Sequence, residues 1–185
     1  MLHDPVLVEK LSKFERTSFE GTVYRATGKS ADPLAASSTG GRWAMSVAED
    51  GGFPILYASL EKDGAVAEIA SYLMLLDPMP RKPIMLHELA VSTSHTLRLL
   101  RGDLTDLGVD MAKYGERNYK QTQIIGAVIN FLNCDGLIAP SARWSCENLM
   151  IFPENHGLQD KLETVQSEET DWVVWSKNVG LLEQE

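Results

Sequence analysis

The sequence predicts one α+β domain, on the strength of its length, its composition and an alternation of two residue patterns. A chain of 185 residues fits one domain, or at most one domain with an appendage, and buries most of its apolar surface on folding. The apolar fraction of 44% and the charged fraction of 23% are those of an ordinary globular protein. Short β-branched or aromatic runs are interspersed with segments whose apolar residues recur at helical spacing, which indicates strands and helices in one fold.

The first part of the chain predicts a helix, a strand and a long loop. Leu7, Leu11 and Phe14 recur at helical spacing, so a short amphipathic helix is expected there. The run GTVYRA at 21–26 is β-branched and aromatic and predicts a strand. From 27 to 52 the chain is dominated by Gly, Ser, Ala, Asp and Pro. That segment is too long for a passive connection, which indicates a functional loop.

The middle of the chain predicts a strand, a helix and a second strand. PILYASL at 54–60 has strand character, and a turn at 62–64 can begin a helix with Asp63 as its candidate cap. Asp77-Pro78 ends that helix, and a strand at 84–91 follows a proline-rich turn. The side chains expected to turn inward from the helix are Ala65, Ile69, Tyr72, Leu73 and Leu76.

The last third predicts a buried helix and three strands. The segment 119–133 is the most helix-like in the chain. GLIAP at 136–140 and NLMIF at 148–152 read as two buried strands on either side of the loop PSARWSCE at 140–147. The tail is acidic until TDWVVWS at 170–176, which predicts an edge strand.

Charge and cysteine content exclude several classes of protein. A formal net charge of −9 argues against a non-specific grip on nucleic-acid phosphates. Cys134 and Cys146 are too few for a disulfide framework or a four-cysteine zinc site, so both are expected to be buried structural residues. The start of the chain is acidic where a signal peptide is basic, and the uncharged stretch 121–134 is shorter than the roughly 18 residues of a membrane span. We therefore expect a cytoplasmic protein that binds no membrane.

Three short motifs fail on inspection. TGKS at 27–30 lacks the first glycine of a phosphate-binding loop, because Val23 stands in its place. His87 and Glu88 resemble the start of a zinc-protease helix, but Val91 replaces the second histidine, so a strand histidine is the better interpretation. No serine occupies a nucleophile elbow. The sequence therefore predicts no metal site and no serine hydrolase chemistry.

Four scattered places combine reactive side chains with unusual backbone, and each alone has an ordinary explanation. An arginine on a strand is more often one partner of a surface ion pair, and a glycine pair is more often a turn. Glu68 interrupts the small apolar run AVAEIASYL, so its carboxylate either points to solvent or is held in a cleft. The four places are Tyr24-Arg25, Gly40-Gly41-Arg42, Tyr57 to Glu68, and Pro140 to Arg143.

The order of these motifs resembles a known family. VYRA, GGRW, ILYAS, AVAE, GLIAPSAR and ENLMIF follow one another as in the RES domain family, over about residues 21–152. The resemblance implies a single domain similar to ADP-ribosyltransferases, with a small mixed β core flanked by helices, and it leaves 153–185 as a C-terminal extension. Members are typically toxins that consume NAD or transfer from it. Their partner is usually an antitoxin with a helix-turn-helix DNA-binding domain that occludes the active site.

The resemblance also implies roles for particular residues. Glu68 would face the positive charge that develops on the ribose as the neutral nicotinamide departs, a step that needs no general acid. Arg42 and Tyr57 would complete the catalytic group, with the arginine on the diphosphate and the ring against the nicotinamide. Glycines at 40 and 41 would bring backbone amides close to the ligand. The residues expected to bind NAD are Arg25, Tyr24, Gly40, Gly41, Ser141, Arg143 and Asn148.

The chain departs from the family pattern in two places, and several functional alternatives are open. The family commonly has an asparagine where this chain has Ala44, and the segment SVAEDGG at 46–52 is longer than a minimal version. The acceptor of the ADP-ribosyl group is water, phosphate or a protein side chain, and we favour destruction of free NAD over protein modification. A catalytically silent module that binds NAD or a partner is the rival interpretation. A homo-oligomer is neither predicted nor excluded.

Overall fold

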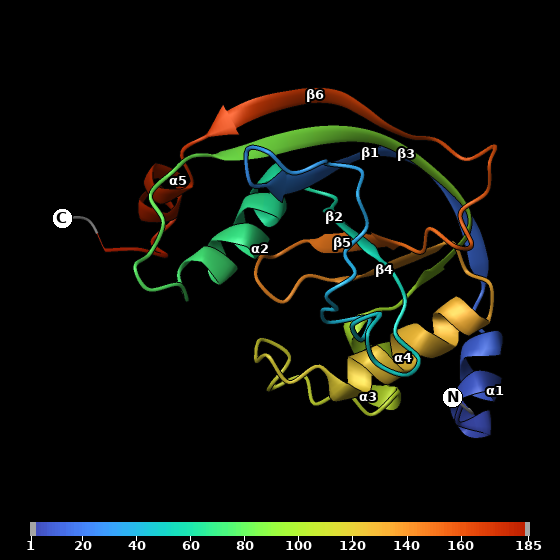
Figure 1. Cartoon of the computed structure of the whole chain (residues 1–185). Coiled ribbons are helices and arrows are strands. Elements are labelled where there is room, and N and C mark those ends of the chain that lie inside the picture. Colours follow the sequence, from blue (N-terminus) through green and yellow to red (C-terminus); the bar gives the residue numbers. More distant parts are fainter. Residues whose placement is uncertain (1–2, 184–185) are drawn as a thin grey trace.

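Six strands form one curved mixed sheet in the computed structural model, which describes residues 3–183 (Figure 1). The long strand β3 (Ile84–Arg98) lies at its centre. One edge of β3 pairs antiparallel with β1 (Arg16–Thr27). The other edge is shared: residues 84–91 pair with β6 (Leu162–Thr170), and residues 96–98 pair in parallel with β4 (Gly136–Pro140).

Two further strands close five of the six strands into a small barrel. β2 (Leu56–Ser59) pairs with β1 on one side and with β5 (Glu147–Ile151) on the other, and β5 pairs with β4. The circuit β1–β2–β5–β4–β3 returns to β1, so these strands leave few unpaired edges. Only β6 lies outside the circuit. The predicted strands at 21–26, 54–60, 84–91, 136–140 and 148–152 are confirmed, with β1 and β3 extending well beyond them.

Helices cover the barrel on two sides (Figure 1). α1 (Pro5–Ser12), α3 (Arg101–Asp106) and α4 (Lys120–Phe131) lie below the barrel in that view, and α2 (Lys62–Leu73) and α5 (Trp172–Asn178) lie beneath the arch of β1, β3 and β6. Three groups of buried side chains fill the spaces between these layers. The predicted helix at 119–133 is confirmed, whereas the short α3 carries too few residues to show a period and was not predicted.

The first helix has the start and the buried stripe that its sequence predicts. Asp4 caps it by accepting a hydrogen bond from the backbone N–H of Val6, and Pro5 occupies the first turn, where its missing N–H costs nothing. Leu7 and Leu11 are buried in the core group that lies between the barrel and the helices α1, α3 and α4, which we call the lower core. The spacing of these apolar residues therefore explains how α1 attaches to the barrel.

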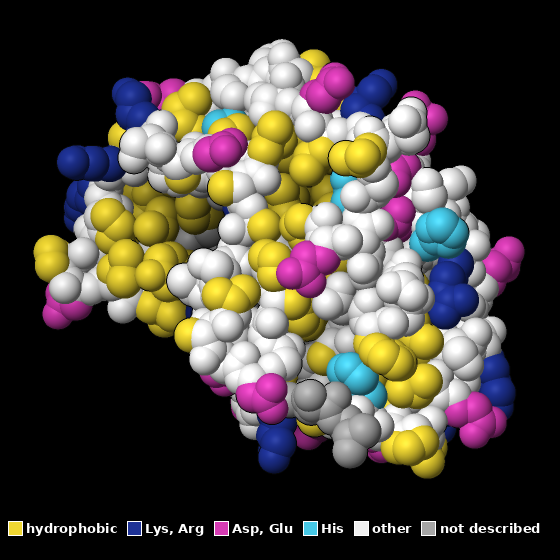
Figure 2. Space-filling view, turned by 45° about the vertical axis from the view of Figure 1, so that its right-hand side comes forward, with side chains coloured by type: hydrophobic (Ala, Val, Ile, Leu, Met, Phe, Trp, Pro, Cys, Tyr) yellow, Lys and Arg dark blue, Asp and Glu magenta, His cyan; other side chains and the backbone are white. Residues whose placement is uncertain are grey.

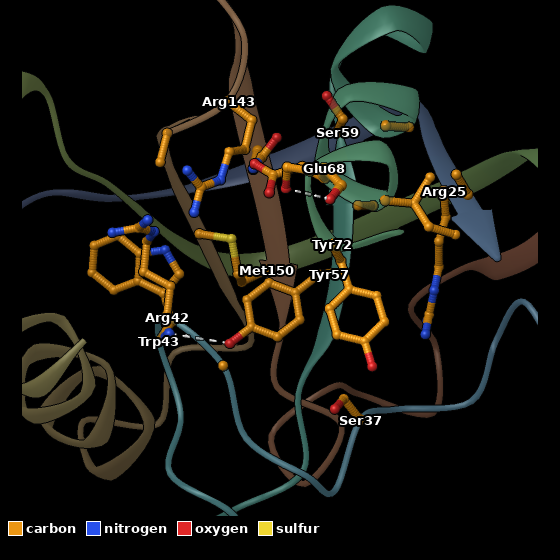
Figure 3. Close-up of a pocket in the computed structure, with 18 of the residues that line it drawn as sticks. Arg25, Ser37, Arg42, Trp43, Tyr57, Ser59, Glu68, Tyr72, Arg143 and Met150 are labelled. Atoms are coloured by element: carbon orange, nitrogen blue, oxygen red, sulfur yellow. Dashed lines mark hydrogen bonds between the residues drawn. The ribbon is translucent and has the colours of Figure 1, made fainter. Parts of the chain in front are cut away.

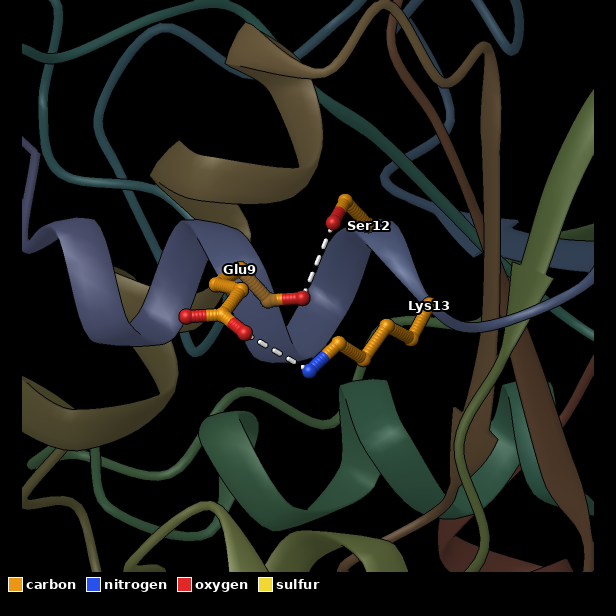
Figure 4. Close-up of polar contacts among 3 residues, drawn as sticks. All are labelled: Glu9, Ser12 and Lys13. Carbon is orange, nitrogen blue, oxygen red and sulfur yellow. Dashed lines mark hydrogen bonds and ion pairs between the residues drawn. The ribbon is translucent and has the colours of Figure 1, made fainter.

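The C-terminal turn of α1 is held by local contacts at the surface (Figure 4). The Lys13 ammonium donates to the Glu9 carboxylate at 2.7 Å, and the Ser12 hydroxyl donates to the backbone carbonyl of Glu9 at 2.8 Å. Both charged side chains are exposed, so the ion pair contributes only about 0.3–0.5 kcal/mol. The packing of α1 depends on its two leucines rather than on this pair.

Two predictions about α2, its cap and part of its buried face, are wrong. Glu61 occupies the N-cap position, while Asp63 lies in the first turn and accepts a hydrogen bond from the Trp175 indole. Tyr72 and Leu76, expected inside, are 55% and 40% exposed. The start of α2 lies close against β2, since a Cβ at Gly64 would lie 2.2 Å from the Ser59 hydroxyl oxygen. Farther along, Ile69 and Leu73 are only partly buried, as they pack against the core group that contains Trp172. The buried residues of α2 are Gly64, Ala65, Val66, Ala67 and Ala70.

The strand predicted at 170–176 is also wrong. Asp171 accepts hydrogen bonds from the backbone N–H groups of Val173 and Val174, which starts the helix α5. Trp172 and Ser176, four residues apart, are its buried positions, as a helix requires. The edge strand of this tail is β6, eight residues earlier, whose side chains are almost all exposed. Such a strand shows no apolar alternation, so no strand was predicted at 162–170.

Gly126 allows α4 to approach the loop that carries Trp43, and its replacement should destabilise the protein. A Cβ at residue 126 would lie 1.9 Å from the Trp43 carbonyl oxygen. We expect Gly126→Ala to lower the free energy of unfolding by about 1–3 kcal/mol, because α4 must shift away from the loop. Gly102→Ala in α3 is the matched control, since a Cβ there meets nothing within 4 Å. Equal urea midpoints for the two variants would contradict this packing account.

Hydrophobic side chains also reach the surface. The face seen in Figure 2 is hollowed, and hydrophobic side chains line the hollow. Tyr72 and Leu75 near the end of α2 and Val174 of α5 are among the exposed large apolar residues. None of the helices within residues 3–183 is long and apolar enough to cross a bilayer.

Candidate active site

A cavity of about 520 Å³ opens between α2, the strands β1, β2 and β5, and the loop 27–52 (Figure 3). Its size is that of an ordinary small-molecule site. The cavity brings together side chains from four separate sequence motifs. The predicted site residues on its wall are Tyr24, Arg25, Gly40, Gly41, Arg42, Tyr57, Glu68, Arg143 and Asn148.

The Glu68 carboxylate enters the cavity from α2 and is held on one side only. Its Oε1 accepts a hydrogen bond from the Ser141 hydroxyl at 2.8 Å and another from the Asn148 side-chain N–H at 2.8 Å. Both bonds go to the same oxygen, so Oε2 has no partner among residues 3–183. Of the two interpretations left open for Glu68, the structure shows a carboxylate held in a cleft.

Ser141 supports Glu68 from behind rather than forming part of the cavity wall. Its side chain is 2% exposed, and its oxygen also accepts hydrogen bonds from the backbone N–H groups of Arg143 and Trp144. With these two N–H groups directed at its oxygen, the hydroxyl proton is free to point at the carboxylate. The geometry therefore gives Ser141 an indirect position, different from the direct contact with NAD that the resemblance implies.

Arg42 is held by aromatic rings instead of an acidic partner. The carbon at the centre of its guanidinium lies 4.5 Å from the centroid of the Tyr114 ring and 4.7 Å from that of Tyr119. One Nη atom donates to the backbone carbonyl of Glu116 at 3.3 Å. Burial lowers the pKa of Arg42, but an arginine side chain stays charged in proteins. The loop thus presents a partly buried cation to the cavity.

Arg25, on β1, is a second partly buried cation, on the opposite side of the cavity in the view of Figure 3. Burial lowers its pKa, partly offset by the charge of Asp32. Its buried Nη1 atom has no hydrogen-bond partner within the described part of the chain. A buried charged donor without an acceptor is costly, which favours an anionic ligand at this position.

Tyr57 lies between the two arginines in the same view, and its hydroxyl is tied to the loop. The backbone N–H of Trp43 donates to the Tyr57 oxygen at 3.1 Å. Burial raises the pKa of Tyr57 far above its usual value, so the phenol is neutral at physiological pH. A neutral aromatic wall suits a planar uncharged group better than an anion.

The glycine pair lies on the cavity wall, but the backbone N–H of Gly41 is already paired within the loop. The Gly41 N–H donates to the Ala44 carbonyl at 2.8 Å, so it closes a turn and is not free for a ligand. A Cβ at Gly41 would lie 2.7 Å from the Tyr57 hydroxyl, and Gly40 has a φ of +83°. The two glycines therefore let the loop turn tightly and pack on Tyr57.

The loop is well packed around Ala44, the residue that stands where the family commonly has an asparagine. Its side chain is fully buried, and its carbonyl accepts from both Gly41 and the Gln123 side chain. Gln123, on α4, also donates to the Gly41 carbonyl at 2.9 Å. No sequence pattern singles out Gln123, because its contacts depend on how α4 packs.

Several aromatic and basic residues of the site were not predicted. Tyr72, Arg117 and Tyr119 line the cavity, and Tyr114 contacts Arg42 from outside it. Tyr114 and Arg117 belong to the segment 107–118, whose sequence has no helical or strand period, and Tyr119 is the first residue of the predicted helix at 119–133. Among described residues on the wall, Glu68 is the only acid. The basic residues there are Arg25, Arg42, Arg117 and Arg143.

Comparison with known protein families shows to which family the chain belongs. Residues 22–174 match the RES domain. The chain belongs to the RES domain family. The match continues past residue 152, through β6 and into α5, so this part of the predicted C-terminal extension belongs to the RES domain itself.

A solved structure supports the fold of this RES domain. A chain in the crystal structure of the M. tuberculosis MbcT-MbcA toxin-antitoxin complex is similar to it, with a TM-score of 0.80 and 20% sequence identity. The likeness covers 94% of this chain and 97% of that chain. The predicted α+β fold with a small mixed β core flanked by helices is therefore confirmed. No curated protein sequence matches the chain.

The described histidines and cysteines lie off the cavity wall. Residues 3–183 contain no group of three or more His, Cys, Asp or Glu side chains placed to hold a metal ion. His87, the strand histidine, bonds the hydroxyls of Thr27 and Ser167 through its two ring nitrogens. Cys134 is buried, whereas Cys146 is only partly buried and contacts Ser59, so the prediction of two buried cysteines holds for one of them.

Proposed function

We propose that this RES domain cleaves the bond between nicotinamide and ribose in NAD. The observation that supports it best is the single carboxylate of Glu68 in a cavity whose other charged wall residues, within residues 3–183, are all arginines. Such a wall attracts an anionic ligand while placing one negative charge where a cation would develop. NAD has both features, a diphosphate and a glycosidic bond to a cationic base.

The reaction needs little more than this carboxylate. Nicotinamide carries a positive charge in NAD and departs neutral, taking the electron pair of the bond to C1 of the ribose. The ribose becomes an oxocarbenium-like cation, and Oε2 of Glu68, which accepts no hydrogen bond from the described residues, faces that charge or a ribose hydroxyl. Ser141 and Asn148 hold the carboxylate through Oε1, so it is oriented before the substrate arrives.

The arginines and Tyr57 orient the substrate. Arg25 and Arg42 supply donors for the diphosphate, and the vacant Nη1 of Arg25 gains an acceptor on binding. The Tyr57 ring, neutral and between the two arginines, packs on the nicotinamide and excludes water from the bond that breaks.

Incubation of the purified protein with NAD tests this function. We expect free nicotinamide to accumulate with turnover, together with ADP-ribose if water is the acceptor or its 1-phosphate if inorganic phosphate is. Tight binding of NAD without nicotinamide release would instead indicate a silent binding module. With radiolabelled NAD and cell extract, label on small products supports destruction of free NAD, and label on a protein band indicates protein ADP-ribosylation.

We also propose that the protein is a toxin restrained by an antitoxin. The similar solved chain comes from a toxin–antitoxin complex, and the family resemblance implies a partner with a helix-turn-helix domain. Expression of the chain alone should arrest growth of a bacterial host, and Arg42→Ala or Glu68→Ala should restore it. Co-expression of a small helix-turn-helix protein encoded beside it should do the same. Unchanged arrest by both variants would show that the toxicity does not come from this site.

A further inference from the structure

Arg42 has an unusual set of contacts for a partly buried cation. Its guanidinium lies over the rings of Tyr114 and Tyr119, and its one hydrogen bond within the described residues goes to a backbone carbonyl. No carboxylate in residues 3–183 lies within ion-pair distance of it. Buried arginines are usually paired with an acid, because desolvation of an unpaired charge is costly.

Both rings are themselves fixed by the fold. Tyr114 is 4% exposed within the lower core, and its hydroxyl donates to the Pro140 carbonyl at 2.8 Å. Pro140 directly precedes Ser141, which donates a hydrogen bond to Glu68. Tyr114 therefore links Arg42, which it contacts through its ring, to the loop that supports Glu68. Tyr119 is the N-cap residue of α4, and its carbonyl accepts a hydrogen bond from the backbone N–H of Gln123.

Aromatic contacts hold a cation without neutralising it. A carboxylate at the same place would fix Arg42 equally well, but it would compete with the phosphates of a ligand and repel them. A ring attracts the cation through its quadrupole and carries no net charge. The arginine therefore stays positioned and keeps its full charge for the ligand.

We propose that Tyr114 and Tyr119 are positioning residues that hold Arg42 as an uncompensated receptor for the diphosphate. This inference rests on the proposed function, since it assigns the source of affinity for the same substrate. The rings act on binding of the diphosphate, which is present equally in the ground state and the transition state. Their loss should raise KM and leave kcat nearly unchanged.

The test compares Tyr114→Leu with Tyr114→Phe. Leucine removes the ring and keeps an apolar side chain, so KM for NAD should rise about tenfold. Phenylalanine loses the bond to Pro140 but keeps the ring, so it should restore most of the affinity. In an Arg42→Ala background, Tyr114→Leu should have no further effect on KM. Phe131→Leu, an exposed aromatic position on α4, is the control and should match the wild type.

Three outcomes would overturn the proposal. They are an unchanged KM in Tyr114→Leu, a fall in kcat alone, and an equal effect of Tyr114→Leu with and without Arg42. If Tyr114→Leu does not fold, Tyr119→Leu at the cavity wall carries the same comparison.

The proposal can fail separately from the proposed function. Calorimetric titration with inorganic pyrophosphate measures the affinity of the cavity for a diphosphate, and it requires no turnover. A weaker affinity for pyrophosphate in Tyr114→Leu supports the positioning role even if no nicotinamide is released. Nicotinamide release with unchanged pyrophosphate affinity in Tyr114→Leu rejects the positioning role alone.

Discussion

Glu68→Gln is expected to lower kcat for nicotinamide release by about 10³-fold while Kd for NAD changes only slightly. Glutamine keeps a carbonyl oxygen for the hydrogen bonds from Ser141 and Asn148, so the side chain keeps its position. What is lost is the negative charge, which acts only when the ribose becomes cationic. Single-turnover measurements at saturating NAD separate this effect from binding.

The matched control for Glu68→Gln is Glu163→Gln on the exposed edge strand β6. It makes the same change of charge and shape far from the arginines, so wild-type turnover is expected. Retention of more than about a tenth of wild-type kcat by Glu68→Gln would mean that its carboxylate does not stabilise the cation.

Arg42→Ala is expected to weaken NAD binding by about 10- to 100-fold, the worth of hydrogen bonds to a charged group. Arg42→Lys should fall between alanine and the wild type, because an ammonium keeps the charge but cannot make paired bonds to a diphosphate. Calorimetric titration of NAD into each variant, in the Glu68→Gln background to prevent turnover, measures the effect.

A surface arginine provides the control for Arg42→Ala. Arg101 is exposed on α3, so Arg101→Ala changes the net charge equally and should bind NAD like its parent. If Arg101→Ala and Arg42→Ala weaken binding alike, the effect comes from the overall field and Arg42 makes no specific contact with the ligand.

The sequence predicted elements that bury an apolar face and missed those that do not. β2, β4, β5 and α4 carry dense apolar runs because they face the core on one or both sides, and their positions were predicted. β6 is polar and exposed, and it is a strand only because the edge of β3 is available for pairing. α5 has a strand-like composition, but a capping aspartate and a buried face of period four make it a helix.

Residues of the candidate site were predicted where a reactive side chain lies in a short, recognisable motif. Arg25, Arg42, Tyr57 and Glu68 each belong to a short recognisable run, and all four line one cavity. The aromatic support of Arg42 was missed because a contact between a cation and a ring leaves no mark in sequence spacing. Tyr114 lies in a loop without periodicity, and Tyr119 is at the start of a predicted helix whose sequence does not indicate this contact.

The supporting residues of the site also show the limit of motif reading. Ser141 and Gly41 were predicted to touch the ligand, yet the structure uses their polar groups to bind Glu68 and Ala44. A motif tells which residues belong together, whereas only the fold shows which of their polar groups are free for a ligand.

The proposed function requires NAD to lie in this cavity, and a crystal structure of the Glu68→Gln protein soaked with NAD tests this most directly. We expect the diphosphate within hydrogen-bond distance of Arg25 and Arg42, and the nicotinamide ribose beside residue 68 with its base against Tyr57. NAD bound elsewhere on the molecule, or an empty cavity at a saturating concentration, would contradict it.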